Sequence, residues 1–298
     1  MKALQERLID PNSPDRRPRR AAYVLPALFT AGNLFLGFLA IVKSFQGALL
    51  AQQGSPGANE AFAAAALMIG VSIFLDGLDG RIARMTNTVS DFGRELDSLA
   101  DVITFGVAPA VLAWAWGFQF MAAPDAQVRE HIHSAGLFVI FVFVLCGASR
   151  LARFNIQTNP VPKNPGRPDR KYFVGLPIPA GAGMVAAVVY VTKGSPIEWW
   201  PLTVAWLFLL ALTSFLMVST WRYRSFKDLN LLKPTSPMSV VFLGCLIWLI
   251  WNYSQPVLLA MSMLYVGSGI VIRVGGIVKR KLRPVPAAPQ QQVGLRNG

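Results

Sequence analysis

Cysteine and histidine are nearly absent from this chain, with two of each among 298 residues. Cys146 and Cys245 both lie in apolar runs, where we expect small core residues rather than a disulfide or a metal pair. His131 and His133 lie in a polar loop and are given no role. The sequence therefore offers no basis for a disulfide framework or a zinc site.

Charged residues are also scarce, at 14% of the chain against 53% hydrophobic residues. A soluble protein of this length would not show separate apolar runs of near-spanning length. The pattern predicts an all-α integral membrane protein with about eight transmembrane helices. We place the spans at 23–46, 61–80, 95–118, 135–152, 174–192, 200–220, 238–252 and 256–274.

The charges that are present are mostly basic, giving a net charge of +13. No soluble basic domain exists to bind nucleic acid, so we expect no nucleic-acid partner. If the N-terminus is cytoplasmic, all of the 28 Lys and Arg residues except Lys43, Arg129 and Lys193 fall on the inner side. This asymmetry favours a multi-pass protein of the cytoplasmic (inner) membrane with both termini cytoplasmic.

The stretch 76–101 lies between apolar runs and contains four regularly spaced aspartates, Asp76, Asp79, Asp97 and Asp101, each of which is costly in a membrane span. On one helix a single face would carry the following residues: Asp76, Asp79, Gly80, Ala83 and Arg84. On a second helix, Gly93, Asp97 and Asp101 recur every four residues. The link at 85–92 is short enough to make these helices antiparallel neighbours. Facing pairs of carboxylates predict a site for divalent metal ions at the cytoplasmic end of the bilayer.

This pattern matches, position for position, the signature of the CDP-alcohol phosphatidyltransferase family, which the chain resembles. The resemblance implies phosphoryl transfer assisted by two divalent cations, Mg²⁺ or Mn²⁺. It implies Asp76, Asp79 and Asp97 as metal ligands, and Asp101 as general base that also touches the second metal. It also implies that CDP and its phosphates contact the following residues: Gly80, Ala83, Arg84, Gly93 and, on the first span, Thr30 and Asn33. The alternative for Thr30 and Asn33 is hydrogen bonding between spans, without a nucleotide. A homodimer is implied by the resemblance alone.

Three further stretches, at 149–155, 175–180 and 217–227, resemble the phosphatidylserine synthase branch of that family. That branch implies a six-helix core plus two C-terminal helices, with CDP-diacylglycerol and L-serine as substrates and membrane lipids around it. The products would be phosphatidylserine and CMP. Arg150 and Arg153 lie one turn apart at the depth of the carboxylates and are candidates for binding the serine carboxylate or the donor's phosphates, with Asn155 as a polar neighbour. The alternative is that both arginines only follow the positive-inside rule.

Two alternatives remain open at the level of the sequence. The acceptor could be another alcohol, such as glycerol 3-phosphate or an inositol phosphate, although a dianionic acceptor should need a larger basic cluster. The acidic cluster could instead be the ion site of a divalent-ion transporter. Against the transporter, the acids lie at one end of the bilayer and no pair of interrupted repeats is present.

The chain is expected to form one transmembrane catalytic domain, residues 23–274. A basic cytoplasmic segment, residues 1–22, precedes it, and we expect no cleavable signal peptide because these residues are too polar. A basic and then disordered cytoplasmic tail, residues 275–298, follows it.

Overall fold

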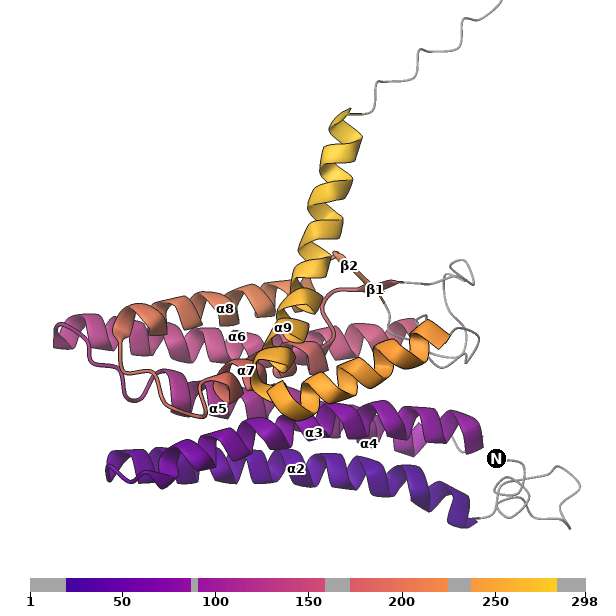
Figure 1. Ribbon diagram of the computed structural model, residues 1–298, viewed down its shortest axis with the longest axis horizontal. Coiled ribbons are helices and arrows are strands. Elements are labelled where there is room, and N and C mark those ends of the chain that lie inside the picture. The colour runs from indigo at the N-terminus through magenta and orange to yellow at the C-terminus, as the bar shows by residue number, and fades with distance from the viewer. Residues whose placement is uncertain (1–19, 87–90, 159–171, 225–236, 283–298) are drawn as a thin grey trace, which may run out of the picture.

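The computed structural model describes residues 20–86, 91–158, 172–224 and 237–282, which form a bundle of helices (Figure 1). The helical elements are α2 (Arg20–Gln52), α3 (Gly57–Thr86), α4 (Asp91–Asp101), η1 (Val102–Val107), α5 (Ala108–Gly117), α6 (Ala126–Thr158), α7 (Ile178–Val191), α8 (Trp200–Val218) and α9 (Pro237–Leu282). Six spans in the described part are long and apolar enough to cross a membrane, and α7 is a shorter apolar helix. The predicted all-α membrane class is therefore confirmed.

Large apolar side chains cover the outside of the bundle as well as its core. Phe35, Phe74, Phe138 and Phe208 are exposed, as expected where the solvent is lipid. Inside, α2 packs along α3 and α6 along α8, and α7 lies against α3 (Figure 1). Helices α2, α3 and α6 are longer than the predicted spans 23–46, 61–80 and 135–152, because hydropathy marks only the part of a helix that is immersed in lipid.

A short β-ribbon interrupts the helical fold. Strand β1 (Tyr172–Val174) pairs antiparallel with β2 (Arg222–Arg224). Gly175 follows β1 with φ +81°, and a Cβ there would overlap the Met217 carbonyl oxygen, so only glycine fits this turn. Its N–H donates to the Trp221 carbonyl at 2.8 Å. The predicted fifth span, 174–192, therefore begins as a strand end and a turn, and helix α7 starts only at Ile178.

Helix α9 contains both of the last two predicted spans, 238–252 and 256–274. The backbone leaves helical geometry at Tyr253 (φ −134°, ψ 46°), three residues before Pro256, so α9 consists of two arms. The first arm follows the bundle, and the second crosses it and projects beyond it (Figure 1). The predicted tail begins inside this second arm, which ends at Leu282, and residues 283–298 lie outside the described residues.

The second arm of α9 is held to the β-ribbon by Tyr223. This side chain is fully buried, and its hydroxyl donates to the Val266 carbonyl at 3.4 Å. Burial, and then the neighbouring Tyr265 phenol, raises the pKa of Tyr223 to about 12, so the hydroxyl keeps its proton at neutral pH. Gly269 leaves room for the Tyr223 ring, because a Cβ at that position would overlap it.

Candidate metal and nucleotide site

Three of the four predicted carboxylates meet where α3 and α4 face each other. Asp76 comes from α3, and Asp97 and Asp101 lie one turn apart on α4. Each of the three offers one carboxylate oxygen, and these oxygens lie within 4.8 Å of one another. The fourth, Asp79, lies in α3 together with Gly80, Ala83 and Arg84, but the side chains of these positions lie outside the described residues.

The cluster has the character of a cation site. Asp101 is 8% exposed, Asp76 and Asp97 are half-buried, and Asp97 Oδ1 is buried with no hydrogen-bond partner among the described residues. Three carboxylates this close repel one another unless a cation or protons compensate their charge. The donor set is all oxygen, which fits Mg²⁺ or Mn²⁺ and does not favour zinc. The residues present therefore fit a divalent metal.

The chain departs from α-helical geometry directly after Asp101. Residues Val102–Val107 form the π-helix η1, which ends as the Ala108 N–H donates to the Ile103 carbonyl. Pro109 lies in the first turn of α5 and cannot donate a backbone hydrogen bond, so the ladder must be rearranged around it. Such π-helical turns occur often at functional sites. Here the turn separates the polar helix α4 from the apolar helix α5 within the predicted third span.

Helix α2 supports η1 through a close contact between Gly37 and Thr104. Thr104 is fully buried, and its hydroxyl donates to the Asn33 carbonyl at 3.3 Å. A Cβ built on Gly37 would lie 2.6 Å from Thr104 Oγ1 and 2.9 Å from Thr104 Cα. Because a backbone atom is involved, a side-chain rotation alone cannot relieve the overlap. Gly37 therefore sets the distance between α2 and the segment that carries Asp101.

We expect Gly37→Ala to lower the thermal unfolding midpoint and the activity, because overpacking costs about 1–3 kcal/mol. Gly32→Ala is the matched control on the same helix, since a Cβ there meets nothing within 4 Å. Both changes carry the same gain in helix propensity, so their difference isolates the contact with Thr104. Equal unfolding midpoints for the two variants, measured in the same detergent, would show that the contact has no structural role.

The two predicted nucleotide contacts on α2 are buried at the same end of the bundle. Thr30 is 7% exposed and Asn33 is fully buried. Neither side-chain atom of the Asn33 amide has a hydrogen-bond partner among the described residues, which is unusual for a buried amide. Helix α2 packs against both α4 and η1, so Asn33 and the carboxylates belong to one region. Gly93, also a predicted contact, is half-buried one turn before Asp97 on α4.

The predicted acceptor residues on α6 differ in their surroundings. Arg150 is 8% exposed, lies over the Phe154 ring at 5.4 Å and interacts electrostatically with Asp101. Arg153 donates to the Val218 carbonyl at the end of α8 at 3.3 Å, and Asn155 donates to the Ser98 hydroxyl at 2.8 Å. The structure thus brings Arg150 to the carboxylates and gives Arg153 and Asn155 contacts that tie α6 to its neighbours.

Sequence reasoning missed Tyr265, on the second arm of α9. Its phenol interacts electrostatically with Arg150, although the two residues are far apart in the chain. A single tyrosine in an apolar run carries no sequence signal that would identify it as part of a functional site. This interaction depends on the bend at Tyr253 and on the packing of α9 against α7.

Comparison with known proteins agrees with this geometry. Residues 23–218 match the family described as CDP-alcohol phosphatidyltransferase. A Helicobacter pylori protein named CDP-diacylglycerol–serine O-phosphatidyltransferase is 38% identical over 215 residues, covering 72% of this chain and 77% of its own. A Bacillus subtilis protein of the same name is 34% identical over 207 residues, covering 68% and 91%. A Saccharomyces cerevisiae protein of that name is 39% identical over 163 residues, covering 54% and 52%.

Proposed function

The chain belongs to the CDP-alcohol phosphatidyltransferase family, and from this premise we propose that it transfers the phosphatidyl group of CDP-diacylglycerol to L-serine, giving phosphatidylserine and CMP. The observation that carries the proposal is the group of three carboxylates between α3 and α4. The names of the relatives from Helicobacter pylori and Bacillus subtilis support serine as the acceptor. The apolar helices place the reaction in a membrane, where the lipid donor resides.

Within this proposal Asp76, Asp79, Asp97 and Asp101 hold two divalent cations, Mg²⁺ or Mn²⁺. When bound, such cations neutralise the diphosphate and stabilise the charge on the departing CMP. The serine hydroxyl oxygen forms the new bond to the phosphatidyl phosphorus as the bond from that phosphorus to the CMP oxygen breaks. Asp101 accepts the hydroxyl proton, because it is the most buried of the three described carboxylates and interacts with Arg150.

The nucleotide would lie against the small residues of α3 and α4, with Gly80, Ala83 and Gly93 leaving room for it. Arg84 would pair with a phosphate. On α2, the Asn33 amide and the Thr30 hydroxyl would contact the nucleotide. Binding of a polar group next to Asn33 would satisfy a buried amide that has no hydrogen-bond partner in the described part of the chain.

Arg150 is the residue that we propose for the serine carboxylate. We expect Arg150→Ala to raise the KM for serine by about tenfold or more, since a hydrogen bond to a charged group contributes about 1.5–3 kcal/mol. The KM for the lipid donor should change less. Arg153→Ala is the control variant, because it removes the same charge one turn away. The Arg153 guanidinium already donates a hydrogen bond to the Val218 carbonyl. A serine KM unchanged in both variants would remove both arginines from the acceptor site.

The choice of serine as the acceptor can be tested with purified protein in lipid nanodiscs. The protein receives CDP-diacylglycerol and one acceptor at a time. The proposal expects CMP release with L-serine and not with glycerol 3-phosphate or an inositol phosphate, and only when Mg²⁺ or Mn²⁺ is present. Release with a phosphorylated acceptor alone would assign the chain to a sister enzyme. Metal flux into liposomes without any transferase activity would favour a transporter instead.

We further propose that the protein lies in the cytoplasmic membrane with both termini and the carboxylates on the cytoplasmic side, and that it forms a homodimer. The distribution of basic residues supports the orientation. A cysteine placed at Lys193, in a variant without Cys146 and Cys245, should then react with an impermeant maleimide added to intact cells. Light scattering of the nanodisc-free protein in mild detergent tests the dimer.

A further inference from the structure

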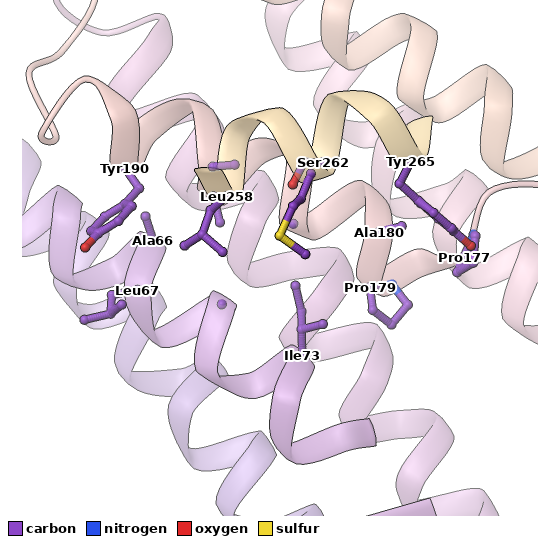
Figure 2. Close-up of a pocket in the computed structure, with 15 residues that line it drawn as sticks. Ala66, Leu67, Ile73, Pro177, Pro179, Ala180, Tyr190, Leu258, Ser262 and Tyr265 are labelled. Atoms are coloured by element: carbon purple, nitrogen blue, oxygen red, sulfur yellow. The ribbon is translucent and has the colours of Figure 1, made fainter. Parts of the chain in front are cut away.

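The second arm of α9 packs against the bundle along its first half. Figure 2 shows Leu258, Ser262 and Tyr265 of this arm facing α3 across a cavity that the two helices form with α7. Val266 is buried, and Ile270 is the last residue of the arm that packs against the core. Residues 271–275, which follow, are all exposed. The end of α9 therefore leaves the surface of the bundle, as Figure 1 also shows.

The end of the arm starts at the depth of the carboxylates. Tyr265 interacts electrostatically with Arg150, which also interacts with Asp101. Helices α2, α3, α6 and α8 run in one common direction, and the end of the arm runs across that direction and past α8 (Figure 1). Because these four helices contain predicted membrane spans, a helix that runs across them lies along the membrane. With the carboxylates on the cytoplasmic side, the arm lies near the cytoplasmic membrane surface.

The sequence of this segment has the pattern of a helix that lies at a membrane surface. On one side of the helix, apolar residues recur every three or four positions: Val271, Val274, Val278 and Leu282. Arg273 and Arg280 are two turns apart on the other side, where Ile272 is the apolar exception. Lys279 and Lys281 border the apolar side. An apolar side bordered by Lys and Arg is typical of interfacial amphipathic helices.

We propose that the end of α9, residues 271–282, binds the headgroups of anionic phospholipids in the cytoplasmic leaflet, an inference that rests on the orientation proposed above. The charge of the segment supports this partner, because four of its twelve residues are Lys or Arg and none is acidic. Basic side chains next to a membrane surface attract anionic lipids. A second copy of this chain fits the segment less well, because its net charge is also +13.

The proposed partner belongs to the class of lipid that the proposed reaction consumes and produces. CDP-diacylglycerol and phosphatidylserine both carry negative charge at neutral pH. The arm leaves the bundle next to Tyr265 and Arg150, in the region of the carboxylates. Binding by residues 271–282 would therefore gather anionic lipids beside the reaction site.

The probe is the fluorophore NBD on Val271→Cys, in the full-length protein without Cys146 and Cys245, in phosphatidylcholine nanodiscs. Val271 is 70% exposed, so a label there does not disturb the packing of the bundle. A small fraction of nitroxide-labelled lipid serves as the quencher. This lipid is either phosphatidylglycerol or phosphatidylcholine, with the nitroxide at the same position near the top of one acyl chain. The ratio of the two quenching efficiencies measures the selection of the headgroup.

We expect labelled phosphatidylglycerol to quench about fivefold more strongly than labelled phosphatidylcholine, the ratio that one basic residue near an anionic surface contributes. High salt should lower this ratio. The double variant Arg273→Gln with Arg280→Gln should remove most of the preference. Arg129→Gln with Lys193→Gln is the matched control, because it removes the same two charges from exposed positions outside α9 and should keep the ratio.

Equal quenching by the two lipids would overturn the inference, because the arm would then lie in lipid without selecting its headgroup. Quenching by neither lipid would also overturn it, and energy transfer between differently labelled copies would then identify a second copy as the partner. The assay needs no substrate and no turnover. A preference for phosphatidylglycerol in a protein that releases no CMP with serine would therefore contradict the proposed acceptor and still support the lipid-binding surface.

Discussion

Replacing Asp97 by asparagine is expected to reduce serine-dependent CMP release by about a thousandfold or more. The loss of one metal ligand forfeits several kcal/mol of charge stabilisation in the transition state, and each 1.4 kcal/mol is a factor of ten in rate. A carboxylate oxygen of Asp97 lies within 4.8 Å of oxygens of Asp76 and Asp101, and Asp97 Oδ1 is buried with no hydrogen-bond partner among the described residues. Steady-state CMP release in nanodiscs measures the effect.

Two comparisons separate this chemical effect from a folding defect. Glu95→Gln removes an exposed carboxylate from the same helix and should leave the rate within about twofold, since exposed surface changes have small effects. Without added metal, Asp97→Asn should be at least as stable to heat as the parent, because the substitution removes a like charge from a crowded cluster. A wild-type rate in Asp97→Asn would contradict the metal site.

Replacing Asp101 by asparagine is expected to lower kcat by about 10²–10⁴-fold, the range that a positioned general base contributes. Asparagine has nearly the same shape but cannot accept the serine proton. Because Asp101 is buried and interacts electrostatically with Arg150, its replacement should weaken Mn²⁺ activation less than Asp97→Asn does. The measurements are kcat and the Mn²⁺ concentration for half-maximal rate.

Asp101→Glu is the control for the base, because it keeps the carboxylate and moves it by one methylene. It should recover part of the rate that Asp101→Asn loses. If the glutamate variant were as inactive as the asparagine variant, with Mn²⁺ activation lost in both, Asp101 would be a metal ligand alone. If Asp101→Asn kept the parental kcat, the residue would have no role in proton transfer.

The arrangement of the carboxylates was the part of the site that the sequence predicted best. Spacings of three and four residues fix which side chains share a helix face, and a short link makes two helices neighbours. Asp76, Asp97 and Asp101 therefore could be placed together from the sequence. Hydropathy likewise predicted the membrane class, because repeated apolar runs of near-spanning length in a chain with so little charge are typical of transmembrane helices.

Other features of the structure depend on contacts between distant segments, and no pattern in the sequence predicts them. The β-ribbon consists of two three-residue strands separated by about fifty residues, one just before the start of α7 and the other just after the end of α8. The π-helix after Asp101 depends on Pro109 and on the close approach of Gly37 to Thr104. The spacing of the motif could not predict either feature.

The C-terminal region was the hardest part to predict. Hydropathy predicts two spans there, 238–252 and 256–274. It does not predict that the backbone bends at Tyr253, so that the second arm crosses the bundle (Figure 1). That bend lets Tyr265 interact electrostatically with Arg150 and supplies one wall of the cavity between α3, α7 and α9. A family signature that ends at residue 218 carries no information about this contribution.

The most direct measurement is a crystal or cryo-EM structure with Mn²⁺ and CDP-diacylglycerol, in which anomalous scattering or strong density locates the ions. The account predicts two Mn²⁺ ions between α3 and α4, bound by oxygens of Asp76, Asp97 and Asp101, with the diphosphate against them. No ion at these carboxylates, or a diphosphate bound elsewhere in the protein, would contradict it.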